Sequence, residues 1–147
     1  MTSKRTPLRL TAQDASDLQV IAATLQDAVG KIGDFRFDKA RRRFTLALNR
    51  FRWEDGRKAR GRRVRCAVDI GGVLGVRAHR LRLDAPEAVL SVLTIGFEAG
   101  DLPGGILNLT FAGGAEIRID VECLDMLLVD ISEPWPATRR PEHKDAL

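Results

Sequence analysis

The chain has 147 residues, of which 44% are hydrophobic and 30% are charged, and its formal net charge is +4. This length fits one domain, and the composition is that of an ordinary globular protein rather than a disordered or fibrous one. No apolar run approaches the ~20 residues of a membrane-spanning helix, and no apolar segment follows the first basic residues as in a secretory signal. We therefore expect a cytoplasmic protein without a membrane span.

The N-terminal part of the chain predicts a short edge strand and then a helix. Residues 7–10 indicate the strand, and Thr11 offers a hydroxyl as helix cap. Apolar residues at helical spacing predict a helix over residues 13–28. Gly30 is expected to end it, because glycine adopts left-handed backbone angles without a steric cost. The residues expected to be buried on this helix are Leu18, Ile21, Ala22 and Leu25.

After the helix, the apolar period changes to two, which is typical of strands. Residues 35–38 and 44–49 predict a hairpin, with a turn at residues 39–41. Residues 63–70 predict a half-buried strand with a basic outer face. In residues 76–83 the alternation switches face, so we expect a β-bulge near His79.

The C-terminal half predicts further strands, a helix and a tail. Residues 88–97 are apolar on both faces, which indicates a central strand, and residues 106–121 predict a hairpin that turns at Ala112-Gly113-Gly114. Leu124, Leu127, Leu128 and Ile131 keep helical spacing and predict a short helix over residues 123–131. Residues 134–147 contain three prolines and predict an extended or disordered tail, from which Trp135 folds back onto the domain.

Together these elements predict an α+β fold. We expect a single domain over residues 1–133, built mainly from an antiparallel sheet or barrel of about seven or eight strands, with one N-terminal helix and a short C-terminal helix. A pleckstrin-homology-like barrel with an extra N-terminal helix is one such arrangement.

Several segments carry a family resemblance. These are LQDAV in the first helix, LNRFRWE in the first hairpin, and FAGGAEIRIDVECLDMLLVDI with the PWP that follows it. Together they resemble a family of short, uncharacterised bacterial proteins known as a domain of unknown function. The resemblance covers residues 8–141 and implies a standalone domain, but it transfers no activity or catalytic residues.

The charges of the chain are strongly segregated. Residues 36–82 hold 16 basic and four acidic residues, whereas residues 83–147 hold four basic and 12 acidic ones. A clustered basic segment can attract phosphate groups or an acidic partner. The alternative is a solvated face whose arginines pair with the acidic residues across the sheet, among them Glu116, Asp120, Glu122, Asp125 and Asp130.

Two function classes follow from the basic segment. The first is a non-catalytic binding module that meets a partner through residues 36–65, such as a second copy that joins its acidic surface to this basic one. The second is an RNA- or single-stranded-nucleic-acid-binding protein, in which aromatic residues between the arginines stack on bases. Phe51 and Trp53 equally fit a packing role. The candidate partner-binding residues are Arg41, Arg42, Arg43, Arg50, Arg52, Trp53, Arg57, Lys58, Arg60, Arg62 and Arg63.

An enzyme is the third class. The chain has no P-loop, no HExxH motif and no serine in a nucleophile elbow, and its two histidines, His79 and His143, lie among basic residues and in the tail. Cys66 and Cys123 lack metal-ligand spacing and are expected to be buried, inert thiols. We therefore expect no metal, no cofactor and no catalytic residues.

Overall fold

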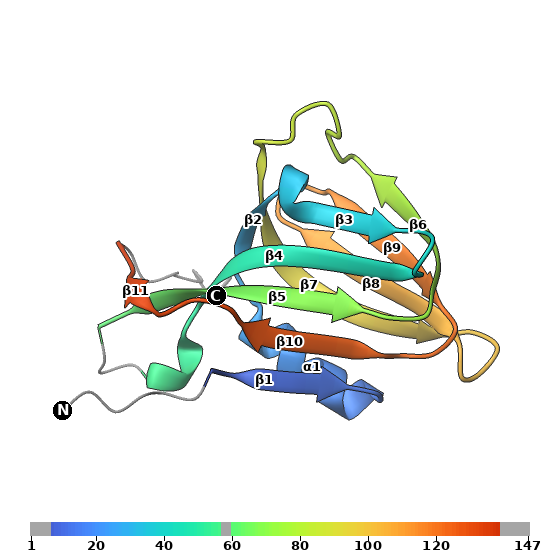
Figure 1. Cartoon of the computed structure of the whole chain (residues 1–147), viewed down its shortest axis with the longest axis horizontal. Coiled ribbons are helices and arrows are strands. Elements are labelled where there is room, and N and C mark those ends of the chain that lie inside the picture. The colour runs from blue at the N-terminus through green and yellow to red at the C-terminus, as the bar shows by residue number, and fades with distance from the viewer. Residues whose placement is uncertain (1–6, 57–59, 139–147) are drawn as a thin grey trace, which may run out of the picture.

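Alternating apolar and polar residues run through most of the chain, and they form strands. The computed structural model describes residues 7–56 and 60–138 as an antiparallel sheet of eleven strands, with one α-helix and two short 3-10 helices (Figure 1). In chain order the elements are β1 (Arg9–Ala12), α1 (Ala15–Thr24), β2 (Val29–Lys31), η1 (Ile32–Asp34), β3 (Phe35–Asp38), β4 (Arg43–Phe51), η2 (Trp53–Asp55), β5 (Arg62–Ile70), β6 (Val73–His79), β7 (Val89–Ala99), β8 (Gly105–Phe111), β9 (Glu116–Val121), β10 (Met126–Asp130) and β11 (Trp135–Pro136).

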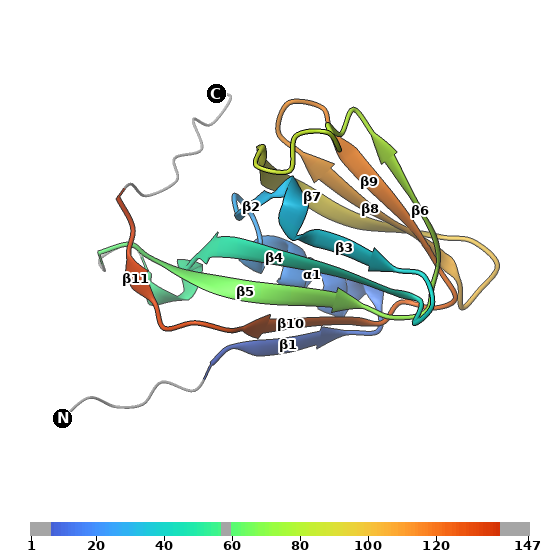
Figure 2. The same ribbon diagram turned by 45° about the horizontal axis from the view of Figure 1, so that its top comes forward.

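The sheet folds over on itself into two layers, with the core between them. The strand order is β1-β10-β5-β4-β2-β7-β8-β9-β6, and β3 and β11 are added at β4 and β5. One layer holds β1, β10, β5, β4 and β3, and the strands β7, β8, β9 and β6 cross behind it (Figure 2). Inward-facing side chains of both layers, such as Leu46, Val68, Leu107 and Ile119, pack in one cluster.

The predicted class and the dominance of antiparallel pairing are confirmed, but three expectations are wrong. The sheet has eleven strands among the described residues rather than seven or eight, because short strands such as β2 and β11 have no clear pattern of their own. It is open, with β1 and β6 at the two ends of the strand order, so it is not a closed barrel. The pleckstrin-homology-like arrangement also fails, because the described chain has no C-terminal helix.

Helix α1 covers one side of the space between the layers, where it contacts both β1 and β7. Its cap is Asp14, whose carboxylate accepts a hydrogen bond of 2.8 Å from the backbone N–H of Asp17. The predicted cap, Thr11, is wrong because it belongs to β1. Leu18 and Ile21 are buried as expected, which fixes the helix to the core.

The helix ends at Thr24 rather than near residue 28. Asp27 adopts a left-handed φ of 63°, and its N–H donates to the carbonyl of Val92 in β7, so pairing with the sheet replaces the next helical hydrogen bonds. Gly30 lies in β2 instead of capping the helix. A Cβ on Gly30 would come within 2.6 Å of a methyl carbon of Leu48, so the glycine lets β2 approach β4 closely.

The predicted C-terminal helix over residues 123–131 is also wrong. This segment forms β10, which lies between β1 and β5 and pairs with both. Met126, Leu128 and Asp130 are buried, in alternation with the half-buried Leu127 and Val129. The period is therefore that of a strand, and a buried aspartate at the third inward position conceals it in the sequence.

Two strand predictions need finer correction. The bulge expected near His79 lies at Leu74, where the register between β6 and β9 shifts. The central position of β7 is confirmed, because it stands between β2 and β8 in the strand order. However, Leu93 on β7 remains 43% exposed, so the described chain does not cover the outer face of this strand.

The hairpins β3–β4 and β8–β9 confirm the predicted turns, and Trp135 with Pro136 forms β11 against Arg63 and Arg62 of β5. Within the ranges that the structure describes, no helix combines the length and apolar character that crossing a membrane requires.

Candidate functional site

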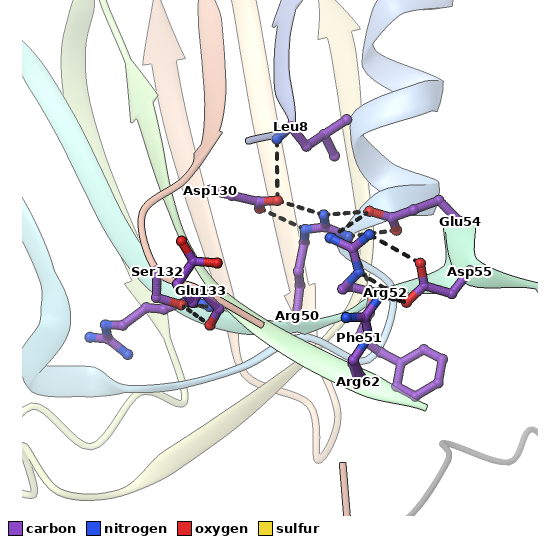
Figure 3. Close-up of polar contacts among 11 residues, drawn as sticks. Leu8, Arg50, Phe51, Arg52, Glu54, Asp55, Arg62, Asp130, Ser132 and Glu133 are labelled. Carbon is purple, nitrogen blue, oxygen red and sulfur yellow. Dashed lines mark hydrogen bonds and ion pairs between the residues drawn. The ribbon is translucent and has the colours of Figure 1, made fainter. Parts of the chain in front are cut away.

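The centre of the basic segment is Arg50, which lies in the protein interior rather than on a surface. It stands on β4 in line with the buried residues Leu46 and Leu48, and its side chain is 0% exposed. Its guanidinium binds the carboxylate of Asp130 on β10 through two hydrogen bonds of 2.9 and 2.8 Å (Figure 3). It binds the carboxylate of Glu54 on η2 through two more, of 2.9 and 2.7 Å.

A fifth hydrogen bond runs from Arg50 to the carbonyl oxygen of Phe51, at 3.3 Å. Arginine has five N–H donors, so the guanidinium is fully satisfied. Burial acts to lower the pKa of Arg50, but the hydrogen bonds that it donates to Glu54 and Asp130 outweigh this effect and raise the pKa above its ordinary value. Arg50 therefore carries a permanent buried charge that holds β4, β10 and η2 together.

Further ion pairs lie beside Glu54 and are centred on Asp55. Arg52 binds Asp55 through two hydrogen bonds of 2.9 and 3.0 Å, and Arg62 reaches the same carboxylate at 3.2 Å. Burial acts to raise the pKa of Glu54, but its hydrogen bonds with Arg50 outweigh this and lower the pKa. Figure 3 shows Arg50, Arg52, Glu54 and Asp55 facing one another.

Arginines at the other end of the segment are paired as well. Arg42 binds Glu122, Arg43 binds Asp69, and Arg65 binds Asp34 at 3.1 Å. Glu122 and Asp130 belong to the acidic half of the sequence, so for these two the predicted pairing between acidic residues and basic strands is confirmed. Asp34, Glu122 and Asp130 lie outside residues 36–82, so their three pairs offset part of the excess positive charge of that segment.

The remaining candidate residues have mixed surroundings. Arg41 lies 3.9 Å from Asp38, whereas Arg60 and Arg63 make no ion pair with any residue that the structure describes. Burial lowers the pKa of Arg63, and its guanidinium carbon lies 5.9 Å from the centre of the Phe51 ring. Arg57 and Lys58 fall outside the described residues.

Phe51 and Trp53 have a packing role, which is one of the two alternatives that the sequence left open. Phe51 is buried and stacks at a tilt on Trp53, with 4.7 Å between ring centres. The indole N–H of Trp53 donates to the carbonyl oxygen of Gln26, just beyond α1, at 3.2 Å. Neither ring lies as a free platform for a nucleic-acid base.

A different feature stands out on the surface, namely an apolar cleft between β3 and β6. Its volume is about 300 Å³, and all of its lining residues are apolar. Phe37 and Leu83 form part of its rim and are 36% and 71% exposed. The lining residues are Ile32, Phe35, Phe37, Phe44, Val76, Ala78, Leu81, Leu83 and Ile117.

Two strand edges border this cleft. β3 pairs with β4 alone and β6 pairs with β9 alone, and no backbone hydrogen bond among the described residues joins β3 to β6. Both strands therefore present unpaired N–H and C=O groups beside an apolar floor. Figures 1 and 2 show both strands on the side of the molecule away from α1.

The rim of the cleft is basic. Arg36 on β3 and Arg77 on β6 are exposed and make no ion pair with any described residue. Arg77 also stands directly opposite Arg118 of β9, and Arg118 pairs with Glu98 at 3.4 Å. The sequence analysis missed this cleft. The signal for it was the alternation of Phe35 and Phe37 with Arg36, which by itself indicates an ordinary amphipathic strand.

A second hollow, of about 490 Å³, lies between α1, β1 and η2. Leu10, Val20 and Trp53 give it an apolar part, but Gln19 and Glu54 also line it. Polar side chains therefore take part in its wall, whereas every residue that lines the cleft between β3 and β6 is apolar.

Comparison with known proteins identifies the family but no relative with an assigned role. Neither the curated proteins nor the solved structures gave a match. A family model matches residues 8–143, in agreement with the resemblance found in the sequence. The chain therefore belongs to the family described as "Protein of unknown function (DUF2948)".

Proposed function

We propose that this domain is a non-catalytic binding module, and that it holds a protein partner in the cleft between β3 and β6. The observation that carries this proposal is the cleft itself, which is lined by apolar residues and has an edge strand on each side. Apolar surface exposed in this way marks sites of association, and a lining without acids, bases or nucleophiles supports binding rather than chemistry.

The proposal keeps the predicted segment 36–65 but shifts the point of contact within it. Phe37 and Phe44 of this segment line the cleft, and Arg41 lies in the turn that joins their strands. Arg50, Arg52 and Arg62 instead serve the fold through their ion pairs. Binding at the cleft therefore depends on apolar contact first and on positive charge second.

The nucleic-acid alternative has less support. Its two requirements are free cations along a strand of phosphates and exposed aromatic rings for stacking. Arg42, Arg43 and Arg65 are paired with carboxylates, and Phe51 is covered. The exposed Phe37 belongs to the rim of an apolar cleft, as do Arg36 and Arg77, which have no ion pair within the described residues, and this setting favours a protein segment over a strand of phosphates.

Site-specific photo-crosslinking in the native host tests this proposal. We would replace Phe37 with p-benzoylphenylalanine, a photoreactive residue of similar shape, and place the same residue at Leu102, which is 78% exposed in the loop between β7 and β8. We expect a discrete protein adduct from position 37 that is absent from position 102.

A matched pair of second substitutions shows whether the adduct depends on the cleft. Ala78→Trp fills the cleft from β6, whereas Thr94→Trp adds the same group to an exposed position on β7. The adduct should disappear with Ala78→Trp and persist with Thr94→Trp. Equal adducts from positions 37 and 102, or an adduct that survives Ala78→Trp, would contradict the proposal.

A further inference from the structure

The two strand edges beside the cleft limit the form that a partner can take. An exposed strand edge pairs with another extended chain, because its free N–H and C=O groups repeat at the spacing of a strand. β3 and β6 both expose such edges, and Phe37 of β3 and Ala78 of β6 line the same cavity. An extended segment that enters the opening meets a hydrogen-bonding edge beside an apolar floor.

The alternation of side chains then sets the composition of one face of that segment. On β3, Phe35 and Phe37 line the cleft, and on β6, Val76 and Ala78 do so. Because successive side chains of a strand point to opposite faces, every second residue of an inserted segment would point into this apolar space. Those residues are therefore apolar.

Charge sets the composition of the other face. Arg36 lies between Phe35 and Phe37, and Arg77 lies between Val76 and Ala78, so both arginines point away from the cleft. Outward residues of an inserted segment would lie near these unpaired cations. Opposite charges on neighbouring strands are favourable, whereas the existing contact of Arg77 with Arg118 places like charges opposite each other.

The other described charged groups around the cleft do not neutralise the positive charges of Arg36 and Arg77. Asp38 lies near Arg41 and Asp84 near Arg82, so these carboxylates are matched by arginines of their own. Glu116 stands opposite His79 at the far end of β6.

We infer that the partner binds as an extended segment that adds to the exposed strand edges, with apolar side chains in the cleft and carboxylates outward beside Arg36 and Arg77. This inference rests on the proposed function and adds the chemistry of the ligand. Main-chain hydrogen bonds supply the affinity, and the alternation of apolar and acidic residues supplies the specificity.

The test uses a synthetic octapeptide that alternates glutamate and valine, with blocked ends and a fluorescent label, and measures its binding by fluorescence anisotropy. A peptide with the same composition in two blocks of four controls for net charge and hydrophobicity. A third peptide is N-methylated at every residue, which removes all of the N–H groups available for strand pairing. We expect the alternating peptide to bind and both control peptides to bind at least about tenfold more weakly.

Charge-reversed variants locate the site. Arg36→Glu combined with Arg77→Glu should weaken binding of the alternating peptide by about tenfold or more, because two attractive cross-strand contacts become repulsive. Arg9→Glu combined with Arg60→Glu changes the net charge equally at exposed positions outside the cleft and should leave binding unchanged.

Three results would overturn the inference. In the first, the block peptide or the N-methylated peptide binds as tightly as the alternating one. In the second, the two charge-reversed double variants lose binding equally. In the third, the chain forms a dimer that Ala78→Trp dissociates, so that a second copy of the chain occupies the cleft. If no peptide binds but Ala78→Trp still abolishes the crosslinked adduct at position 37, the proposed mode of binding is wrong and the proposed binding function is retained. If Ala78→Trp does not abolish the adduct, the proposed binding function is itself wrong.

Discussion

The substitution Asp130→Asn separates a buried ion pair from the exposed pairs elsewhere in the chain. Asn has nearly the same shape as Asp, but it presents a neutral amide to Arg50 in place of a carboxylate. The Asp130 side chain is 3% exposed and that of Arg50 is 0% exposed, so water cannot replace the lost contacts. The variant leaves a guanidinium in the interior with one of its two carboxylate partners removed.

The expected cost follows from that burial. Removing one partner of a buried ion pair typically costs about 3–5 kcal/mol. Glu54 still binds Arg50 through two hydrogen bonds, so we expect the lower end of this range, about 3 kcal/mol. That is a large part of the ~5–15 kcal/mol by which small domains are usually stable.

Glu54→Gln is the matched control, because it makes the same chemical change on the other side of Arg50. The Glu54 side chain is 39% exposed, so solvent takes over part of its role, and the expected cost is only about 1 kcal/mol. Urea unfolding followed by tryptophan fluorescence gives both free energies by linear extrapolation. Equal losses for the two variants would show that burial does not decide the strength of these pairs.

A double variant distinguishes the loss of charge pairing from a simple disruption of packing. Arg50→Met combined with Asp130→Leu replaces the pair with apolar side chains and should recover most of the stability lost in Asp130→Asn. If the double variant is less stable than Asp130→Asn, the cost of Asp130→Asn does not come from leaving Arg50 as an unpaired buried charge.

Three other predictions follow from burial and ionisation. Arg50 lowers the pKa of Glu54 in the folded state, so the contribution of Glu54 to stability is present above its ordinary pKa of 4.5 and is lost as the pH falls below that value. The unfolding free energy should therefore fall more steeply below pH 4.5 in the wild type than in Glu54→Gln. Parallel pH curves for the two proteins would disprove this coupling. Leu25→Ala should cost about 2–5 kcal/mol in urea unfolding, because this side chain is fully buried; a cost near zero would show that α1 is peripheral. Cys123 is exposed, so the expectation that both thiols are buried is wrong for this residue and holds only for Cys66. Iodoacetamide should label Cys123 in the native protein, whereas Cys66, whose pKa burial raises to about 12, should react only after unfolding. Two labelled thiols per native chain would contradict the burial of Cys66.

The sequence predicted those strands whose inward positions are all apolar. The alternation over residues 64–70 and the glycine turn at residues 112–114 were sufficient to place β5 and the β8–β9 hairpin. These patterns are local, so each segment carries its own information about its structure.

The prediction from the sequence is wrong where inward-facing positions of the strands are charged. Arg50 interrupts the apolar alternation of β4, and Asp130 interrupts that of β10, 80 residues away. Each residue taken alone indicates a surface position, and only their pairing explains the burial of both. For the same reason Arg50 was assigned to a partner-binding surface, and the leucines of β10 were assigned to a helix.

The cleft escaped prediction for a different reason. Its lining comes from η1, β3, β4, β6, β9 and the segment before β7, and only the path of the sheet brings these elements together. No single segment has an unusual pattern. Predicting a surface between unpaired strand edges requires the strand order, and a single sequence does not reveal that order.

The position of β10 has a consequence for synthesis. The ribosome makes β1 and β5 early, but the strand that lies between them is made about 60 residues after β5. Until then, the emerging chain holds two unfilled strand edges and a guanidinium at position 50 without its main carboxylate. A nascent chain that stops before Asp130 therefore lacks both the strand that joins β1 to β5 and the buried carboxylate that pairs with Arg50.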